Sequence, residues 1–204
     1  MPKRVEKKQI ELMKKRIFIY LFDGYADWEI AYLAPELNKS DHHELIYASK
    51  DGHSVKSMGG LVVKPTCSLS EINTEAVELL VLPGGTMWEK ENPEKIQQLV
   101  IQVDKSNKPI AAICAATTFL GKIGMLDEIK HTSNDLNYLK GIAPAYKGAD
   151  LYQNTLAITD SNIITANGIA PIEFTREVFR MVNLYKEENL EKWFQLFKNG
   201  IWKE

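Results

Sequence analysis

Strand-length apolar runs alternate along this chain with stretches of helical periodicity, and this order constrains the fold more than any other feature. The runs IFIYLF at 17–22, ELLVL at 78–82 and PIAAIC at 109–114 are continuously apolar, as strands buried on both faces of a parallel sheet are. Helical patterns at 93–106 and 171–185 follow such runs. We therefore predict an α/β fold with a mostly parallel central sheet covered by helices.

Shorter elements complete this order. A strand is predicted at 44–48, and a hairpin is predicted around Gly59 and Gly60, where two short apolar segments flank the glycines. The segments at 156–160 and 163–167 predict a second pair of strands joined by a two-residue turn. Residues following the first strand recur at near-helical spacing from Trp28 to Leu37, which predicts a helix there.

The spacing of apolar residues near the carboxyl end of the chain predicts an amphipathic helix. Its apolar residues Leu190, Trp193, Phe194 and Phe197 fall at i, i+3, i+4 and i+7, so they share one face. We expect this face to pack on the chain's own sheet, with a contact in a dimer as the alternative.

Length and charge narrow the class of protein. The chain has 204 residues, which is near the usual size of one domain, so we expect an extension over 1–12 and a single domain over 13–204 that includes the last helix. Lysine plus arginine number 25 against 27 aspartate plus glutamate, and this balance argues against nucleic acid as a partner. No apolar run approaches the roughly 20 residues that span a bilayer, so no membrane association is expected.

The cysteine count indicates a compartment. Only Cys67 and Cys114 occur, too few for a disulfide framework, and free thiols in a reducing cytosol are the interpretation that follows. Cys67 precedes a predicted loop and is expected to serve packing alone. The predicted location is cytoplasmic.

Cys114 is the most informative candidate residue. It ends a predicted buried strand and precedes a predicted helix, at the carboxyl edge of the sheet where ligand crevices form. A thiol at such a turn is exposed and lies at the positive end of the helix dipole, which favours the thiolate. The geometry is similar to the nucleophile elbow of hydrolases, with cysteine replacing serine. The alternative is a small buried apolar side chain.

Two other segments reach the same edge. The backbone N–H groups of Gly85 and Ala115 could form an oxyanion hole, and Gly84 and Gly85 permit close approach of a ligand. A tight turn without further role is the alternative for the glycines. Glu29 follows the first strand, in a crevice that would raise its pKa and keep it protonated, so that it could donate a hydrogen bond to a thiolate. Its alternative is a solvated helix residue.

Histidine is scarce, and only His131 follows the cysteine in the sequence. It is the one candidate general base, although a lone histidine is often structural. The chain contains no GxGxxG fingerprint, no P-loop, no HExxH motif and no paired Cys or His spacing typical of zinc. We therefore expect no nucleotide, flavin or metal cofactor.

Four segments together resemble the ThiJ/PfpI superfamily, and the resemblance covers residues 14 to 186. They are IFIYLFDGYADWE, ELLVLPGG, PIAAICAAT and IITANG, in this order. The resemblance implies a flavodoxin-like three-layer sandwich with helices on both faces of the sheet. It also implies a reactive cysteine at Cys114, an acidic partner at Glu29, a glycine loop at Gly84 and Gly85, and a backbone amide facing the site at Ala115.

The chain also departs from the pattern of that superfamily. Peptidase-like members carry histidine directly after the cysteine, where this chain has Ala115. Other members supply a histidine after the elbow helix, at a place that falls by spacing near Ser133 or Asn134, and His131 lies a few residues early. No histidine follows His131, so the glutaminase chemistry of the related amidotransferases is excluded.

The leading hypothesis is a cytosolic cysteine-dependent hydrolase of the PfpI type, an intracellular peptidase with weak activity. Cys114 is its nucleophile, Glu29 the carboxyl partner and His131 the base. One alternative is glyoxalase- or deglycase-like chemistry on small reactive carbonyls. A second is a redox or stress sensor without catalysis, in which Cys114 oxidises to a sulfinic acid. The expected partners are a small-molecule or peptide substrate and, because members of the superfamily usually pair, a second copy of the chain.

Overall fold

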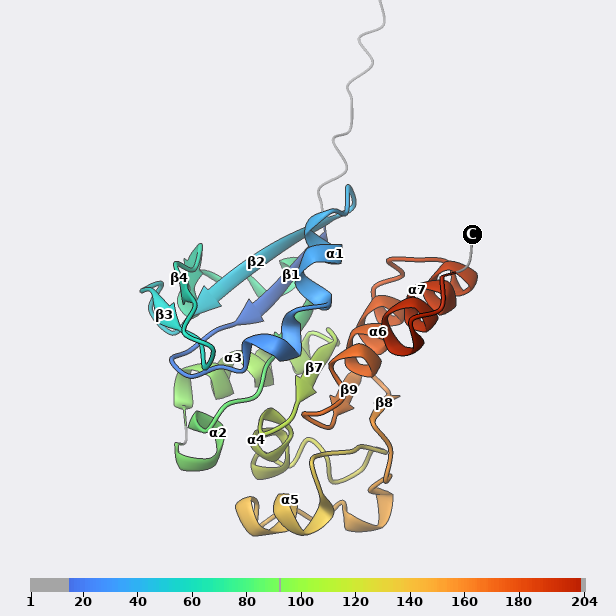
Figure 1. Cartoon of the computed structure of the whole chain (residues 1–204). Helices are drawn as coiled ribbons and strands as arrows, with labels where there is room; N and C mark the ends of the chain where they lie inside the picture. Colours follow the sequence, from blue (N-terminus) through green and yellow to red (C-terminus); the bar gives the residue numbers. More distant parts are fainter. Residues whose placement is uncertain (1–14, 92, 203–204) are drawn as a thin grey trace, which may run out of the picture.

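Seven strands form one sheet in the order β5-β2-β1-β6-β7-β9-β8, and every neighbouring pair is parallel except β8 and β9 (Figure 1). The computed structural model describes residues 15–91 and 93–202, so the extension expected at 1–12 and the domain start expected at Met13 lie outside the described residues. The sheet strands are β1 (Lys15–Tyr20), β2 (His43–Ser49), β5 (Cys67–Ser68), β6 (Val77–Leu82), β7 (Ile110–Ile113), β8 (Ala157–Asp160) and β9 (Ile163–Ala166). A separate antiparallel hairpin consists of β3 (Val55–Lys56) and β4 (Val62–Val63).

Helices cover both faces of this sheet. The longer ones are α1 (Leu33–Asn38), α2 (Met87–Lys90), α3 (Glu94–Lys105), α4 (Ala116–Lys122), α5 (Leu136–Ile142), α6 (Pro171–Met181) and α7 (Glu187–Asn199). Short 3-10 helices are η1 (Asp27–Ile30), η2 (Leu69–Glu71), η3 (Thr74–Ala76) and η4 (Ala149–Leu151). The helices α1 and α6 lie on one face and α3 and α4 on the other, with α7 lying over α6. The predicted α/β, flavodoxin-like three-layer arrangement is confirmed.

The central strands are buried along their whole length, as their continuous apolar sequences predict. All four residues of β7 are fully buried, and β6 is buried from Leu79 to Leu82. Because β6 and β7 lie between β1 and β9, helices cover both of their faces and no polar side is needed. The carboxyl ends of β1, β6, β7 and β9 therefore meet at one edge of a rigid core.

The predicted helix from Trp28 to Leu37 is wrong in its continuity, because the chain forms η1 and then α1. A proline lacks the N–H that an interior helical residue donates, and the start of α1 at Leu33 places Pro35 in the first turn, where no such bond is required. The break has a consequence for the site, since it leaves Glu29 on a separate short turn.

The last helix lies on other helices and not on the sheet, which corrects the expected packing. On α7, Trp193 packs against Phe179 of α6 with ring centroids 5.0 Å apart. Phe197 packs against Tyr32, which directly precedes α1, at 5.4 Å, and remains 41% exposed. The helix thus adds a second layer over α1 and α6.

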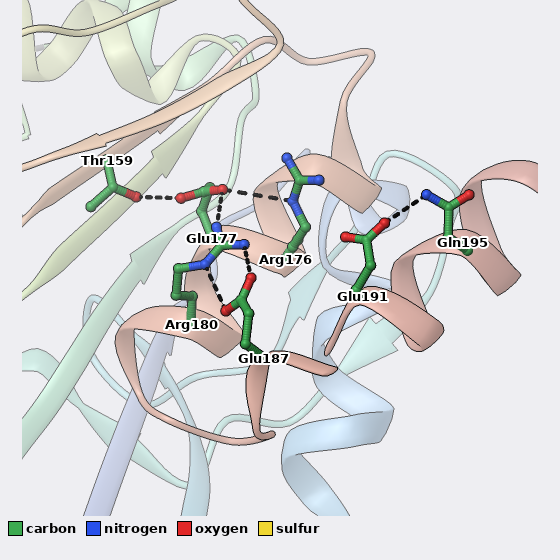
Figure 2. Close-up of polar contacts among 7 residues, drawn as sticks. All are labelled: Thr159, Arg176, Glu177, Arg180, Glu187, Glu191 and Gln195. Carbon is green, nitrogen blue, oxygen red and sulfur yellow. Dashed lines mark hydrogen bonds and ion pairs between the residues drawn. The ribbon is translucent and has the colours of Figure 1, made fainter. Parts of the chain in front are cut away.

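An ion-pair network fixes the corner between α6 and α7 (Figure 2). Arg180 of α6 donates to Glu177 at 2.6 Å and to Glu187 at the start of α7 at 2.7 Å. Glu177 also accepts a hydrogen bond from Thr159 of β8 at 2.9 Å. Partly exposed pairs of this kind contribute little stability singly. Their effect here is to orient the two helices relative to the edge strand.

Candidate active site

Cys114 occupies a strained turn between β7 and α4. Its φ of 60° lies in the left-handed region, which a residue with a side chain rarely adopts. The turn is held on both sides, because the Cys114 N–H donates to the Ala166 carbonyl at 2.9 Å and Thr117 Oγ1 donates to the Cys114 carbonyl at 2.6 Å. The sulfur is therefore presented at the carboxyl edge of the sheet by a fixed backbone, and the side chain is half-buried.

Glu29 is fully buried and lies against Cys114. The Gly84 N–H donates to its Oε2 at 2.5 Å, while the Gly84 carbonyl accepts from the Ala26 N–H at 2.9 Å. A side chain at position 84 would place its Cβ 2.7 Å from the Cys114 Cβ and 2.8 Å from both oxygens of Glu29. Position 84 therefore has room for a glycine only, and this allows the side chains of Cys114 and Glu29 to approach each other closely. The predicted meeting of an early carboxyl group with the cysteine is what the structure contains.

The second carboxyl oxygen of Glu29, Oε1, lies as close to the Cβ position of residue 84 as Oε2 does. It is buried and accepts no hydrogen bond from a nitrogen or oxygen donor of the described residues. Burial raises the pKa of Glu29 to about 7, while hydrogen bonds from Gly84 and Cys114 act to lower it. A carboxyl group with such a pKa can both accept and return a proton near neutral pH.

The electrostatics of the sulfur differ from the expectation of a favoured thiolate. Burial raises the pKa of the Cys114 thiol to about 11, and the charge of Glu29 acts in the same direction. The Asn134 amide and the Ala115 N–H act to lower it. The helix-dipole argument fails because α4 is only seven residues long and the desolvation of the thiol is larger. Above about pH 7 the pair therefore carries one negative charge, which lies on Glu29 while the proton stays on the thiol.

The residues predicted for the oxyanion hole and the glycine loop have different places. The Gly84 N–H is already bonded to Glu29, so this residue positions the carboxyl group and is not free to bind an oxyanion. Gly85 has a φ of 152° and lies so close to Phe22 that a Cβ would be 2.6 Å from its ring. Ala115 directly follows the sulfur and its N–H stabilises negative charge there. Of the predicted donors, Ala115 fits the role best.

The expected base, His131, does not face the sulfur. It is fully buried, its Nδ1 donates to the Ile129 carbonyl at 2.7 Å, and its Nε2 accepts a short hydrogen bond from the Tyr146 hydroxyl. Burial lowers its pKa. Since both ring nitrogens are committed and a ring of Tyr152 packs against the imidazole, His131 is a structural residue. Its assignment as the base is not supported by this geometry.

Asn134 takes the place beside the sulfur that spacing indicated for Ser133 or Asn134. Its Nδ2 donates to Cys114 Sγ at 3.4 Å. Ser133 is instead fully buried and bonded to Thr117 at 2.7 Å. Gly168 lies against both residues, because a Cβ there would be 2.7 Å from the sulfur and 3.2 Å from Asn134 Oδ1. Sequence alone could not choose between Ser133 and Asn134, since the choice depends on which side chain the loop before α5 turns inward.

The described part of the chain was also searched for other kinds of site. It contains no group of three or more histidine, cysteine, aspartate or glutamate side chains placed to hold a metal ion. Within the same residues, no helix combines the length and the apolar character that crossing a bilayer requires.

Comparison with known proteins places the chain in a family. Residues 15–181 match the model of the DJ-1/PfpI family, and the chain belongs to this family. The ThiJ/PfpI resemblance inferred from the four sequence segments is confirmed.

Three similar proteins illustrate the range of the family. The chain is 34% identical over 194 residues to a Bacillus subtilis protein named "Uncharacterized protease YoaZ", covering 92% of each chain. It matches the crystal structure of a thiJ/pfpI family protein from Bacillus anthracis with a TM-score of 0.86 and 37% identity, over 93% of each chain. It is 31% identical over 119 residues to "Deglycase PfpI" of Pyrococcus furiosus, covering 58% of this chain and 71% of that protein.

Proposed function

We propose that this protein is a cysteine-dependent enzyme in which Cys114 attacks small reactive carbonyl compounds, with Glu29 as its acid–base group. The observation that supports the proposal is the pairing of a buried carboxyl group, held at Oε2 and unpartnered at Oε1, with the thiol. A pKa near 7 for Glu29 suits proton transfer in both directions at physiological pH.

The proposed substrate class is a 2-oxoaldehyde such as methylglyoxal. Glu29 takes the thiol proton as Sγ bonds to the aldehyde carbon, and it returns that proton to the carbonyl oxygen, which gives a hemithioacetal. Glu29 then removes the hydrogen of this carbon as a proton and delivers it to the neighbouring carbon, while the hydroxyl proton passes from the oxygen of the first carbon to the oxygen of the second, so that a thioester of a 2-hydroxy acid forms. Water breaks the C–S bond and restores the thiol. The sum is methylglyoxal plus water to lactic acid, without an oxidant or reductant.

Each step uses one acid–base group adjacent to the sulfur, which is what the site provides. An aldehyde needs no protonated leaving group at the moment of attack, whereas a peptide must release an amine. Without a placed acid for that amine, peptide cleavage loses about 10²- to 10⁴-fold in rate. The same site that suits carbonyl addition is therefore poorly equipped for proteolysis.

Cysteine-dependent hydrolysis of peptides or esters is the second candidate function. The N–H of Ala115 and the amide of Asn134 lie at the sulfur, where donors could stabilise a tetrahedral intermediate. The name of the Bacillus subtilis relative agrees with this reading. We propose that such activity is weak and that activated esters are cleaved faster than amides.

Lactate formation from methylglyoxal tests the leading proposal. We expect turnover by the wild type, loss of turnover in Cys114→Ala, and at least a 100-fold decrease in Glu29→Gln, because the amide cannot move a proton. Cys67→Ala is the matched control and should retain the wild-type rate. Equal rates in wild type and Cys114→Ala would remove the nucleophile, and peptide cleavage without lactate formation would favour the hydrolase.

The proposal also includes a homodimer in a reducing compartment. Both cysteines are free. The exposed apolar side chains of Trp28, Met58, Leu61 and Val62 lie on η1 and around the hairpin of β3 and β4, and hydrogen bonds from Ser57 Oγ to Asp27 and from the Met58 N–H to the Tyr25 carbonyl join these elements. A charge placed there by Val62→Asp should produce a monomer in light-scattering measurements if this surface forms the interface. A dimer of unchanged mass would place the interface elsewhere.

A further inference from the structure

Asn134 is held in one orientation by the residues around it. The Gly168 N–H donates to Asn134 Oδ1 at 2.9 Å, and since an N–H can only donate, the amide oxygen must lie on that side. The NH₂ group is therefore turned toward Cys114 Sγ, 3.4 Å away. Asn167 restrains the backbone of the same residue, because its Nδ2 donates to the Asn134 backbone carbonyl at 2.9 Å.

Tyr138 is a further polar side chain that interacts with Asn134. Tyr138 is one helical turn further along, in α5, and its hydroxyl donates to Glu89 Oε1 at 2.7 Å. A phenol that donates to a carboxylate turns its lone pairs away from that carboxylate, and donation of this kind makes the oxygen a stronger acceptor. Burial, the hydrogen bond to Glu89 and the charges of Glu89 and Cys114 raise the pKa of Tyr138, whereas the Asn134 amide lowers it. The Tyr138 hydroxyl thus interacts with the Asn134 amide and with the charge of Cys114.

We propose that Asn134 is a catalytic residue that stabilises negative charge at Cys114 with one N–H, and that Tyr138 and Glu89 are positioning residues that fix the amide. The inference rests on the proposed function for its place in turnover, since it assigns the charge-stabilising group of the same site. This series of interacting groups begins at Glu89 of α2, passes through Tyr138 of α5 to the Asn134 amide, and ends at the Cys114 sulfur.

An amide in this place has a chemical consequence. Asparagine donates hydrogen bonds at every ordinary pH, but it neither takes nor gives a proton. The sulfur is therefore stabilised as an anion without a second titrating group, and all proton movement is left to Glu29. This arrangement suits attack on a carbonyl carbon, but Asn134 cannot supply the proton that an amine leaving group requires.

Alkylation of Cys114 by iodoacetamide, followed against pH by mass spectrometry, tests the inference without any substrate. Asn134→Asp keeps the oxygen that Gly168 requires, removes both donors and adds a negative charge next to the sulfur. We expect the midpoint of alkylation to rise by at least about one pH unit, with alkylation at pH 7 slower by about tenfold or more. Asn137→Asp is the matched control, because it adds the same charge at an exposed position only three residues away. It should keep the wild-type midpoint.

The positioning residues have their own variants. Tyr138→Phe keeps the ring and removes the hydroxyl, so the midpoint should rise by less than in Asn134→Asp. Glu89→Gln preserves an oxygen that accepts from Tyr138 but removes its charge, so the midpoint should rise by less than in Tyr138→Phe, whereas Glu89→Ala should behave as Tyr138→Phe does.

An unchanged midpoint in Asn134→Asp would overturn the role of Asn134, and an unchanged midpoint in Tyr138→Phe would overturn the positioning role. If Asn134→Asp does not fold, Tyr138→Phe decides the inference alone. A shifted midpoint in a protein that forms no lactate would support the assignment of Asn134 and overturn the proposed reaction instead, so the two failures are distinguishable.

Discussion

Replacing the buried carboxyl group by an amide should stabilise this protein, and only above acidic pH. In Glu29→Gln the amide oxygen can accept from the Gly84 N–H as Oε2 does, and the NH₂ group takes the place of a protonated Oε1 beside the thiol. The variant thus resembles the wild type with Glu29 neutral. The two proteins differ in stability only where Glu29 is charged in the folded or unfolded chain.

The magnitude follows from the pKa of Glu29, which burial raises from 4.5 in the unfolded chain to about 7 in the folded one. The folded state holds the proton more tightly, so its advantage is complete below pH 4.5 and is lost as pH rises to about 7. Each unit of pKa difference is worth about 1.4 kcal/mol, which gives a loss of about 3 kcal/mol in the wild type. Glu29→Gln should show no such loss.

Urea unfolding followed by tryptophan fluorescence measures this difference, since Trp88 is fully buried in the core. Between pH 4.5 and pH 8 the midpoint of Glu29→Gln should gain about 1–2 M urea over that of the wild type. Glu71→Gln is a control of opposite sign, because hydrogen bonds from Ser68 lower the pKa of Glu71. A constant difference between Glu29→Gln and the wild type at all pH values would refute the reasoning, as would a variant less stable at pH 8.

Three further predictions concern the neighbours of this pair. His131→Leu should lower stability by about 1–3 kcal/mol in thermal unfolding, because the buried hydroxyl of Tyr146 loses its acceptor, yet leave alkylation of Cys114 within about twofold of wild type. A large fall in alkylation would restore His131 as a base. Mild peroxide should add two oxygens to Cys114 and none to Cys67 in intact-mass and peptide spectra, since the Asn134 amide donates to the Cys114 sulfur, and equal modification of both would count against a sensing role. Gly84→Ala should cost about 1–3 kcal/mol in urea unfolding and slow lactate formation, because its Cβ would meet Cys114 and Glu29; wild-type turnover would contradict the close contact.

The fold could be predicted from sequence because its strands are buried. Continuous apolar runs such as 78–82 and 109–114 have one stable environment, the middle of a covered parallel sheet. Elements governed by local geometry were not predicted, among them α2, α5 and the two-residue strand β5. Four- to seven-residue helices carry too few apolar positions for a period to be recognised.

The site was predictable where backbone geometry determines it, and less so where side chains compete. Cys114 and Gly84 follow from the sharp turns that end β7 and β6, and Glu29 follows from the segment after β1. His131 was expected at the sulfur because it is near in sequence, but Tyr146 and the Ile129 carbonyl satisfy both of its nitrogens in the core. Sequence distance cannot show which polar groups a buried ring will find.

Asn134 lies where the ThiJ/PfpI resemblance led us to expect a histidine, and this difference determines where the thiol proton can go. A histidine beside a cysteine can take the thiol proton itself, and the carboxyl group then serves only to orient or stabilise. With an amide in that place, the proton can move only between Cys114 and Glu29, because Asn134 cannot accept it and His131 lies in the core. Burial of Glu29 matters for this reason, because it raises the pKa of the carboxyl group, and a carboxyl group near its usual pKa would be too weak a base to assist the thiol. The buried carboxyl group and the asparagine at position 134 therefore act together. Asn134→His should add a second titration near pH 6.5 to the profile of Cys114 alkylation against pH, because histidine can exchange the thiol proton. A profile without that titration would mean that position 134 does not exchange protons with the sulfur.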